Sequence, residues 1–396
     1  MPARTSRHRA DPLPLRGRLQ RALRRQRRHA ARDAALGAAI CAVLVLALPR
    51  VDDQTAADAT TLATANADQG VFSAAMVGDV MFGRHVEAVA EREGYRALLE
   101  PAAPHLDADY VSANLEQVVS DRADLPEAGK LIHLKSDARP LDALADVGFT
   151  TLTLANNHTM DHGLPGLGDT IEAVEAAGMD HVGAGMDIEQ ASSVLYQDLG
   201  ELTVATLSFT DAFVEGFIAR AFQGGVLDAD PGRVIPLVEQ AAANSDLVIA
   251  QFHWGREYDF SPTGTQRDLA VAAAEAGADI VVGHHPHVLM PVERIDDTVV
   301  FYSLGNFVFD QGWSRTRETA VARYTLAEDG TATIALEPMF IREATPTPLD
   351  GLDSVYRRTR IHQQLAGEGL DWRREGSRLV TEVDHRHVLE RAEVAR

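Results

Sequence analysis

The chain has 396 residues, of which 45% are hydrophobic and 24% are charged, so it is long enough to bury the core of one large domain or two. Residues 1–33 carry eleven Arg and two Asp, about +9, whereas the whole chain is −21, which leaves about −30 for residues 34–396. A body this acidic repels nucleic acid and is poorly suited to lie on anionic lipid. Cys41 is the only cysteine, which excludes an intrachain disulfide and a cysteine-based metal site.

The first 70 residues are predicted to direct the chain to a membrane. An uncharged apolar run, AALGAAICAVLVLALP at residues 34–49, directly follows the basic arm of residues 1–33. The run is shorter than the roughly 20 residues that span a bilayer comfortably, yet longer than a typical signal-peptide core. Because basic arms stay in the cytoplasm, we expect a single-pass anchor with the following domain outside the cytoplasm. A protein secreted after signal cleavage is the alternative. Residues 50–70 are expected to form a flexible linker.

From residue 71 onward, short apolar runs alternate with segments whose apolar residues recur at helical spacing. The predicted strands are residues 72–78, 110–115, 150–156, 202–209, 246–253 and 279–284. The predicted helices are residues 139–148, 166–178, 232–244 and 265–277. This alternation predicts right-handed crossovers and a largely parallel sheet. After residue 290 the pattern changes to hairpin strands, and the charged residues 346–396 are predicted to form peripheral helices.

Polar side chains follow five of these strands, at the point where each strand ends. They are Asp79; Asn114 and Glu116; Asn156, Asn157, His158, Asp161 and His162; His253 and Glu257; and His284, His285 and His287. Each alone has an ordinary explanation, such as a turn residue, a helix cap or a hydrogen-bonded core histidine. Together they are expected to meet at one rim, because functional groups gather at the carboxyl ends of parallel strands. Carboxylate, amide and imidazole groups suit divalent ions, and two ions about 3.5–4 Å apart would activate water.

The motifs that carry these residues resemble those of a known family. In order along the chain they are GDVM, NLE, ANNHTMDHG, HWGREY, GHHPHV and YSLGNFVFDQ. They are similar to the CapA family of capsule and poly-γ-glutamate synthesis proteins, within the calcineurin-like metallophosphatase superfamily. The resemblance covers residues 71–345 and implies an α/β fold, in which two mixed β-sheets form a sandwich flanked by helices around a dinuclear metal site. The remaining residues, 346–396, would form a C-terminal helical extension.

The resemblance implies a role for each motif residue. The metal ligands would be Asp79, Glu116, Asn157, His253, His285 and His287, and the catalytic residues His158 and Asp79. His284, Asn156 and Asn306 would support them, although pairing His284 with His287 is an alternative. Met81 replaces a histidine of the superfamily motif, and Glu116 replaces an aspartate, so one of the two metal positions lacks a ligand. We therefore expect one or two divalent ions, either Mn, Fe or Zn.

Few basic residues lie close to the motifs, namely Arg84, Lys135 and Arg256. We expect these three residues to bind an anionic polymer or a phosphoester substrate. The expected function is poly-γ-glutamate or capsule synthesis at the cell membrane, together with other synthesis components, with hydrolysis of a phosphoester or a glutamyl amide. Two alternatives stay open: a non-catalytic scaffold that couples polymer synthesis to export, and a generic metallophosphoesterase.

Overall fold

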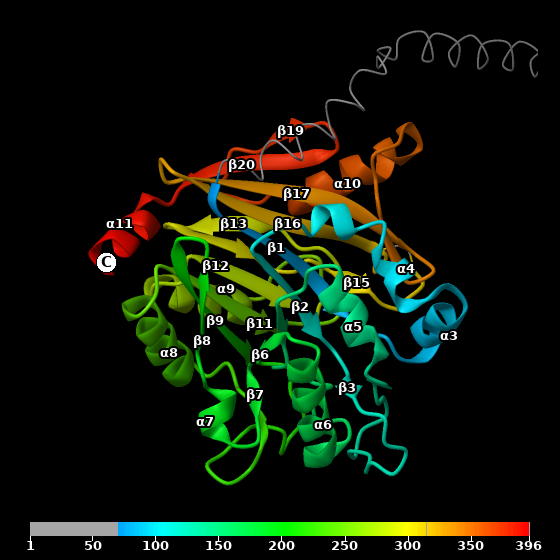
Figure 1. Ribbon diagram of the computed structural model, residues 1–396. Helices are drawn as coiled ribbons and strands as arrows, with labels where there is room; N and C mark the ends of the chain where they lie inside the picture. Colours follow the sequence, from blue (N-terminus) through cyan, green and yellow to red (C-terminus); the bar gives the residue numbers. More distant parts are fainter. Residues whose placement is uncertain (1–69, 314, 396) are drawn as a thin grey trace, which may run out of the picture. The chain divides into compact units, whose positions relative to one another are not determined.

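The computed structural model describes residues 70–313 and 315–395 (Figure 1). The predicted basic arm (1–33), the predicted membrane segment (34–49) and all of the predicted linker (50–70) except Gly70 lie outside the described residues. Within the part that the structure describes, no helix has both the length and the apolar character needed to cross a membrane.

The elements follow one another along the chain in an irregular alternation of strands and helices. The strands are β1 (Gly70–Val80), β2 (Tyr110–Leu115), β3 (Val118–Val119), β4 (Lys135–Ser136), β5 (Thr151–Thr153), β6 (Asp180–Val182), β7 (Ala184–Gly185), β8 (Leu195–Leu199), β9 (Leu202–Thr210), β10 (Gly225–Val226), β11 (Leu247–His253), β12 (Ile280–His284), β13 (Val292–Ile295), β14 (Thr298–Phe301), β15 (Asn306–Val308), β16 (Glu318–Ala327), β17 (Thr331–Arg342), β18 (Thr345–Pro348), β19 (Arg373–Glu375) and β20 (Arg378–Asp384). The helices are α3 (Arg84–Glu93), α4 (Tyr95–Leu99), α5 (Arg139–Asp146), α6 (Gly163–Ala176), α7 (Ile188–Ala191), α8 (Pro231–Ala243), α9 (Gly264–Glu275), α10 (Val355–Leu365) and α11 (Arg386–Ala395), with 3-10 turns at Ala103–His105 and Leu352–Ser354.

Two mixed sheets form the centre of the domain. The larger sheet has the order β19-β20-β17-β16-β1-β2-β5-β6, with β15 paired to β1 and β18 paired to β17. The second sheet has the order β13-β14-β12-β11-β9-β8. Strands β1, β2, β5 and β6 run parallel, as do β9, β11, β12 and β14, whereas the remaining pairs within these two sheets are antiparallel apart from β1 with β15. Each sheet therefore contains one block of parallel strands.

The apolar side chains divide the domain into four layers, helix, sheet, sheet and helix (Figure 1). Because side chains alternate along a strand, Phe72, Ala74 and Met76 of β1 lie in the core between the sheets, whereas Ala75 and Val77 face the helices. Helices α3 to α6 cover the outer face of the larger sheet, and α8 and α9 cover the outer face of the second sheet. The prediction of two mixed sheets flanked by helices is confirmed at this level.

Two segments differ from their sequence patterns. Residues 298–309 lie in the segment predicted to form hairpin strands, but the chain turns at Gly305, whose φ of 71° is left-handed, so that β14 joins the second sheet and β15 joins the larger one. Residues 346–396, predicted to be helical, contain α10 and α11 but also β19 and β20. Those two strands extend the larger sheet, because the alternating apolar residues of β20 pair with β17.

Candidate metal centre

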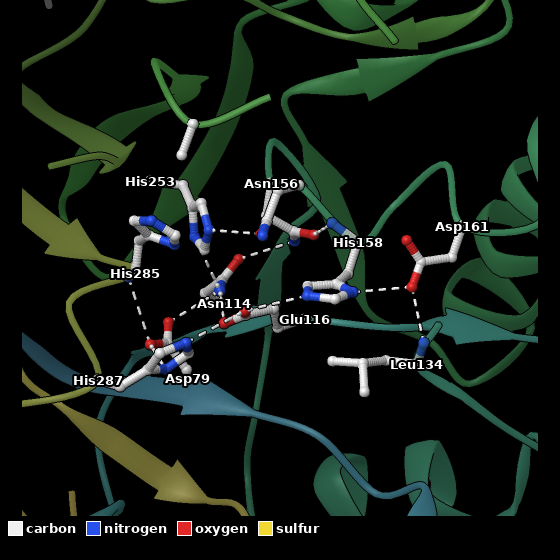
Figure 2. Close-up of polar contacts among 12 residues, drawn as sticks. Asp79, Asn114, Glu116, Leu134, Asn156, His158, Asp161, His253, His285 and His287 are labelled. Atoms are coloured by element: carbon white, nitrogen blue, oxygen red, sulfur yellow. Dashed lines mark hydrogen bonds and ion pairs between the residues drawn. The ribbon is translucent and has the colours of Figure 1, made fainter. Parts of the chain in front are cut away.

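The polar side chains at the strand ends meet where the parallel strands of both sheets finish (Figure 2). In the larger sheet, strand pairing places Asp79 opposite Asn114, and β15 places Asn306 on the other side of Asp79. In the second sheet, strand pairing places His253 opposite His284. Backbone register therefore fixes where these residues lie, before any contact between their side chains is considered.

Asn114 connects the two sheets at this rim. Its Nδ2 donates to Asp79 Oδ1 at 2.8 Å and lies 3.4 Å from Glu116 Oε2 and 3.3 Å from His253 Nδ1. Its Oδ1 accepts a hydrogen bond from Asn156 Nδ2 at 3.0 Å. Because Asn114 is fully buried and contacts residues of both sheets, it holds the carboxylates of one sheet beside the imidazole of the other.

Candidate ligand atoms gather into three overlapping groups, each with all its atoms within 4.8 Å of one another. The groups are Glu116, His253 and His285; Asp79, Glu116 and His287; and Glu257, His285 and His287. All of these residues are buried except Glu257, which is exposed. His285 Nδ1 is buried and has no hydrogen-bond partner among residues 70–313 and 315–395. An unpartnered imidazole nitrogen amid carboxylates fits the coordination of a divalent cation, so the residues present suit the metal that the motifs imply.

Asn157 lies at the same rim, since its Oδ1 accepts from His253 Nε2 at 2.9 Å. Asn156 supports the loop that carries Asn157: its Nδ2 also donates to the Leu115 carbonyl at 2.8 Å, and its Oδ1 accepts from the His158 backbone N–H at 3.0 Å. The structure thus brings Asp79, Glu116, Asn157, His253, His285 and His287 to one place, and their roles as metal ligands stay predictions.

His284 ends β12, and His285 and His287 follow it in the next turn. His284 Nε2 donates to Gln251 Oε1 at 3.1 Å, and its buried Nδ1 lies 3.5 Å from Asp79 Oδ1 without a hydrogen-bond partner among the described residues. His287 Nδ1 lies 2.8 Å from Asn306 Oδ1 and 3.2 Å from Asp79 Oδ2. His285 and His287 have φ angles of 91° and 56°, a left-handed backbone that costs about 1–3 kcal/mol per residue. The pair His285 and His287, rather than His284, faces the other candidate ligands.

His158 lies beside the centre with a charged pair behind it. Its Nδ1 is 2.8 Å from Asp161 Oδ2, and Asp161 forms an ion pair with Lys130. A carboxylate can only accept, so Nδ1 carries a proton, and Nε2, 3.9 Å from Glu116 Oε1, faces the centre. Lys130 Nζ also donates to the Asn157 carbonyl at 2.6 Å and lies 3.2 Å from His158 Nδ1. Burial and the Lys130 charge lower the pKa of His158, and Asp161 opposes them.

Sequence reasoning missed two of these residues as parts of the site. The motifs do not include Lys130, although Lys130 and Lys135 are the only lysines in 396 residues, the first just before β4 and the second at its start. The sequence shows Glu257 close to His253 but assigns it no ligand role. Among the expected residues, Met81 is fully buried and offers no oxygen or nitrogen ligand. Arg84 pairs with Asp310, and Arg256 is exposed, so neither joins the buried cluster.

The buried charges of the centre influence one another strongly. Burial and the Asp79 carboxylate raise the pKa of Glu116 well above its usual range. Burial raises the pKa of Asp79, but His284 and His287 more than offset this and hold it well below its usual range. Burial lowers the pKa of His287, yet Glu116 and Asp79 raise it to about 9, whereas burial and the His287 charge lower the pKa of His285 to about 4. The two shifts are coupled, because the negative charge of Glu116 is itself a cause of the raised pKa of His287.

Comparisons with known proteins agree with the motifs. Residues 73–311 match the family described as bacterial capsule synthesis protein PGA_cap. The chain is 43% identical to the PGA biosynthesis protein CapA of Bacillus subtilis (strain 168), over 81% of this chain and 84% of that protein. It is 41% identical to the capsule biosynthesis protein CapA of Bacillus anthracis, over 80% and 79% of the two chains. The solved structure of TT1561 from Thermus thermophilus aligns at 12% identity with a TM-score of 0.32, over 63% of this chain and 93% of that one, a similarity too low to support an argument.

We expect His285→Ala to weaken divalent metal binding by about 100-fold or more, because the variant loses an imidazole that two of the candidate groups share. Metal content per chain, measured by mass spectrometry after dialysis, checks this expectation. The matched control is His181→Ala on the edge strand β6, which should retain its metal. Equal metal content in the two variants would remove His285 from the centre.

Metal affinity is expected to rise with pH. Ligation requires a neutral His287, whose pKa of about 9 keeps its imidazole protonated below that value, and an ionised Glu116, whose pKa burial raises. A cation must therefore displace protons, and the apparent binding constant should rise about tenfold per pH unit for each proton displaced. Titration calorimetry between about pH 6 and about pH 8, together with proton release into weak buffer, measures the effect. An affinity that does not change with pH would contradict it.

Proposed function

We propose a function from one premise: this chain belongs to the bacterial capsule synthesis protein family PGA_cap. The matched segment, residues 73–311, contains every candidate metal ligand. Relatives named for PGA and capsule biosynthesis align with this chain over most of their length. We infer that the chain acts in the synthesis of a capsular poly-γ-glutamate, together with other components of that synthesis.

The chemical part of the proposal is a hydrolytic reaction on a phosphoester or a glutamyl amide. It depends on one observation: six side chains able to hold a cation gather at the rim, and His158 Nε2 lies 3.9 Å from one of them, Glu116. The cation would be held by Asp79, Glu116, His253, Glu257, His285 and His287. Asn157 lies beside this group, because its Oδ1 accepts a hydrogen bond from His253 Nε2. A bound divalent ion supplies a Lewis acid and an activated water. A ligand set that combines carboxylates with imidazoles suits Mn, Fe or Zn.

His158 is the residue placed to move a proton in this reaction. Asp161 fixes the proton on Nδ1, which leaves Nε2 directed at the centre, and Lys130 fixes Asp161 through an ion pair. The buried Asp161 also accepts a hydrogen bond from the Leu134 backbone N–H at 2.7 Å, so its carboxylate is held from several sides. An imidazole held in this tautomer and orientation, with Nε2 free of a proton, is suited to accept a proton from the attacking water.

A second candidate function is a non-catalytic scaffold that couples polymer synthesis to export. Met81 favours it, because a buried thioether stands where the motif of the superfamily has a histidine ligand. Glu257 favours the catalytic function, because it adds a carboxylate to a group that contains two histidines. The two functions differ in whether the purified chain turns over any substrate.

The place of the chain in the cell is also a proposal. We propose a single-pass membrane protein whose globular domain lies outside the cytoplasm. The support is the apolar run of residues 34–49 directly after eleven arginines, since basic flanks remain cytoplasmic. External protease should then degrade the domain in intact spheroplasts that express the full chain. Protection equal to that of a cytoplasmic marker protein would contradict this topology.

We expect His158→Gln to lower turnover by about 10²- to 10⁴-fold while leaving bound metal unchanged, because the substitution removes a proton acceptor rather than a ligand. Turnover of a phosphodiester and of a γ-glutamyl oligomer by the full-length chain, with and without a chelator, measures this. His181→Gln on β6 is the matched control. If the wild-type chain turned over neither substrate, the scaffold function would stand. Turnover of phosphodiesters alone would indicate a generic metallophosphoesterase.

A further inference from the structure

Four arginines from three segments of the chain form a basic surface beside α10. Arg315 and Arg317 precede β16, Arg342 ends β17, and Arg357 lies in the first turn of α10; we call these four residues the arginine surface. The guanidinium carbons of Arg357, Arg317 and Arg342 lie 3.6, 4.4 and 5.7 Å from the ring centre of Phe340. That of Arg315 lies 4.3 Å from the ring centre of Phe260. Aromatic rings therefore hold all four guanidinium groups in place.

Among the side chains that the structure describes, the ion pairs of this surface contain more arginines than carboxylates. Glu318, almost fully buried, lies 3.4 Å from Arg315 and 3.8 Å from Arg357, and it also pairs with Arg360. Three arginines thus share one carboxylate. Glu343, exposed beside Arg342, has its carboxylate 3.6 Å from His85. Burial and the charge of Arg342 lower the pKa of Arg357, as expected where cations are held together.

The arginine surface is connected to the metal centre through the loop of residues 255–260. Arg315 donates to Gln364 Oε1 at 3.0 Å, and Gln364 Nε2 donates to the Phe260 carbonyl at 2.8 Å. The same loop carries Glu257, one of the candidate ligands, and Tyr258. The ring centre of Tyr258 lies 6.3 Å from that of His287 and 5.1 Å from that of Trp313, and both Tyr258 and Trp313 are partly exposed. A ligand that lies across the surface would therefore extend toward the centre.

We propose that the arginine surface binds the α-carboxylates of a poly-γ-glutamate chain and directs that chain to the metal centre. This inference rests on the proposed function. A γ-linked polymer keeps one free carboxylate per residue, and planar guanidinium groups bind carboxylates with two hydrogen bonds. A single exposed pair of this kind is weak and is screened by salt. Several pairs along one polymer reinforce one another, because each contact raises the effective concentration of the next carboxylate. The surface also offers a polyanion an attractive place on a body of about −30.

The test is binding of fluorescently labelled poly-γ-glutamate to the full-length chain, followed by anisotropy at low and high salt. The variant Arg317→Gln/Arg342→Gln/Arg357→Gln should bind about tenfold or more weakly and show a shallower salt dependence. The control Arg92→Gln/Arg233→Gln/Arg386→Gln removes the same charge from three exposed arginines on α3, α8 and α11 and should change affinity by less than about twofold. Equal losses in the two variants would overturn the proposal.

Further measurements identify the class of ligand and distinguish failure of the arginine-surface proposal from failure of the proposed function. If the triple variant lost affinity for polyphosphate or for phosphatidylglycerol vesicles but not for poly-γ-glutamate, the carboxylate assignment would be overturned. Thermal unfolding reports folding, and if the triple variant is unfolded, Arg342→Gln, at an exposed strand end, should still bind about threefold more weakly. Metal content and turnover are measured on the same samples. If the triple variant binds the polymer more weakly but retains its metal, the role of the arginine surface is supported even when no turnover occurs. If the variant retains both turnover and polymer binding, the proposed role of the arginine surface is overturned and the proposed function is not.

Discussion

The burial of charge at one rim is the constraint on which the rest of the structure depends. Asp79 and Glu116 are almost entirely out of water, and His253, His284, His285 and His287 surround them with little exposure. Buried ionised groups cost folding free energy unless opposite charges and hydrogen bonds compensate. The chain compensates in part with the Asn114 amide and with the His287 imidazole, whose pKa the charges of Glu116 and Asp79 raise. A cation that binds the folded state alone would add opposite charge at this rim and stabilise the fold.

Parallel strands in two sheets make this arrangement possible. Each parallel block places its carboxyl ends on one edge, and the two edges meet where Asn114 contacts both Asp79 and His253. The chain also crosses between the sheets near this rim, because β14 and β15 are separated by only a short turn at Gly305. The same crossing brings Asn306 to His287 at 2.8 Å. The position of the centre is therefore a consequence of topology, and the left-handed histidines adjust its ligands locally.

The features that could be predicted from the sequence are those determined by the pattern of residues within one segment of the chain. The strands of residues 110–115 and 246–253 are observed at β2 and β11 because their apolar runs are long and bounded, and the CapA resemblance is confirmed by the family match. Features that need contacts between distant segments were not predictable. Lys130 joins the site only because its loop folds onto Asp161, and β20 forms only because β17 offers an unpaired edge. The charged residues of 346–396 favour helices locally, but strand pairing outweighs that preference for part of the segment.

The arginine surface and the acidic body have opposite effects on a polyanion, and together they select where it binds. A net charge of about −30 repels such a polymer from most of the surface, so a small basic area has a large influence on where the polymer settles. Phe340 and Phe260 hold the guanidinium groups, and the loop of Phe260 also carries Glu257 to the metal centre. Polymer contact at the arginine surface therefore acts on the same loop that completes a candidate ligand group. Capture of the polymer and chemistry on it would then be coupled through residues 255–260, whether the reaction is hydrolysis or transfer to a partner.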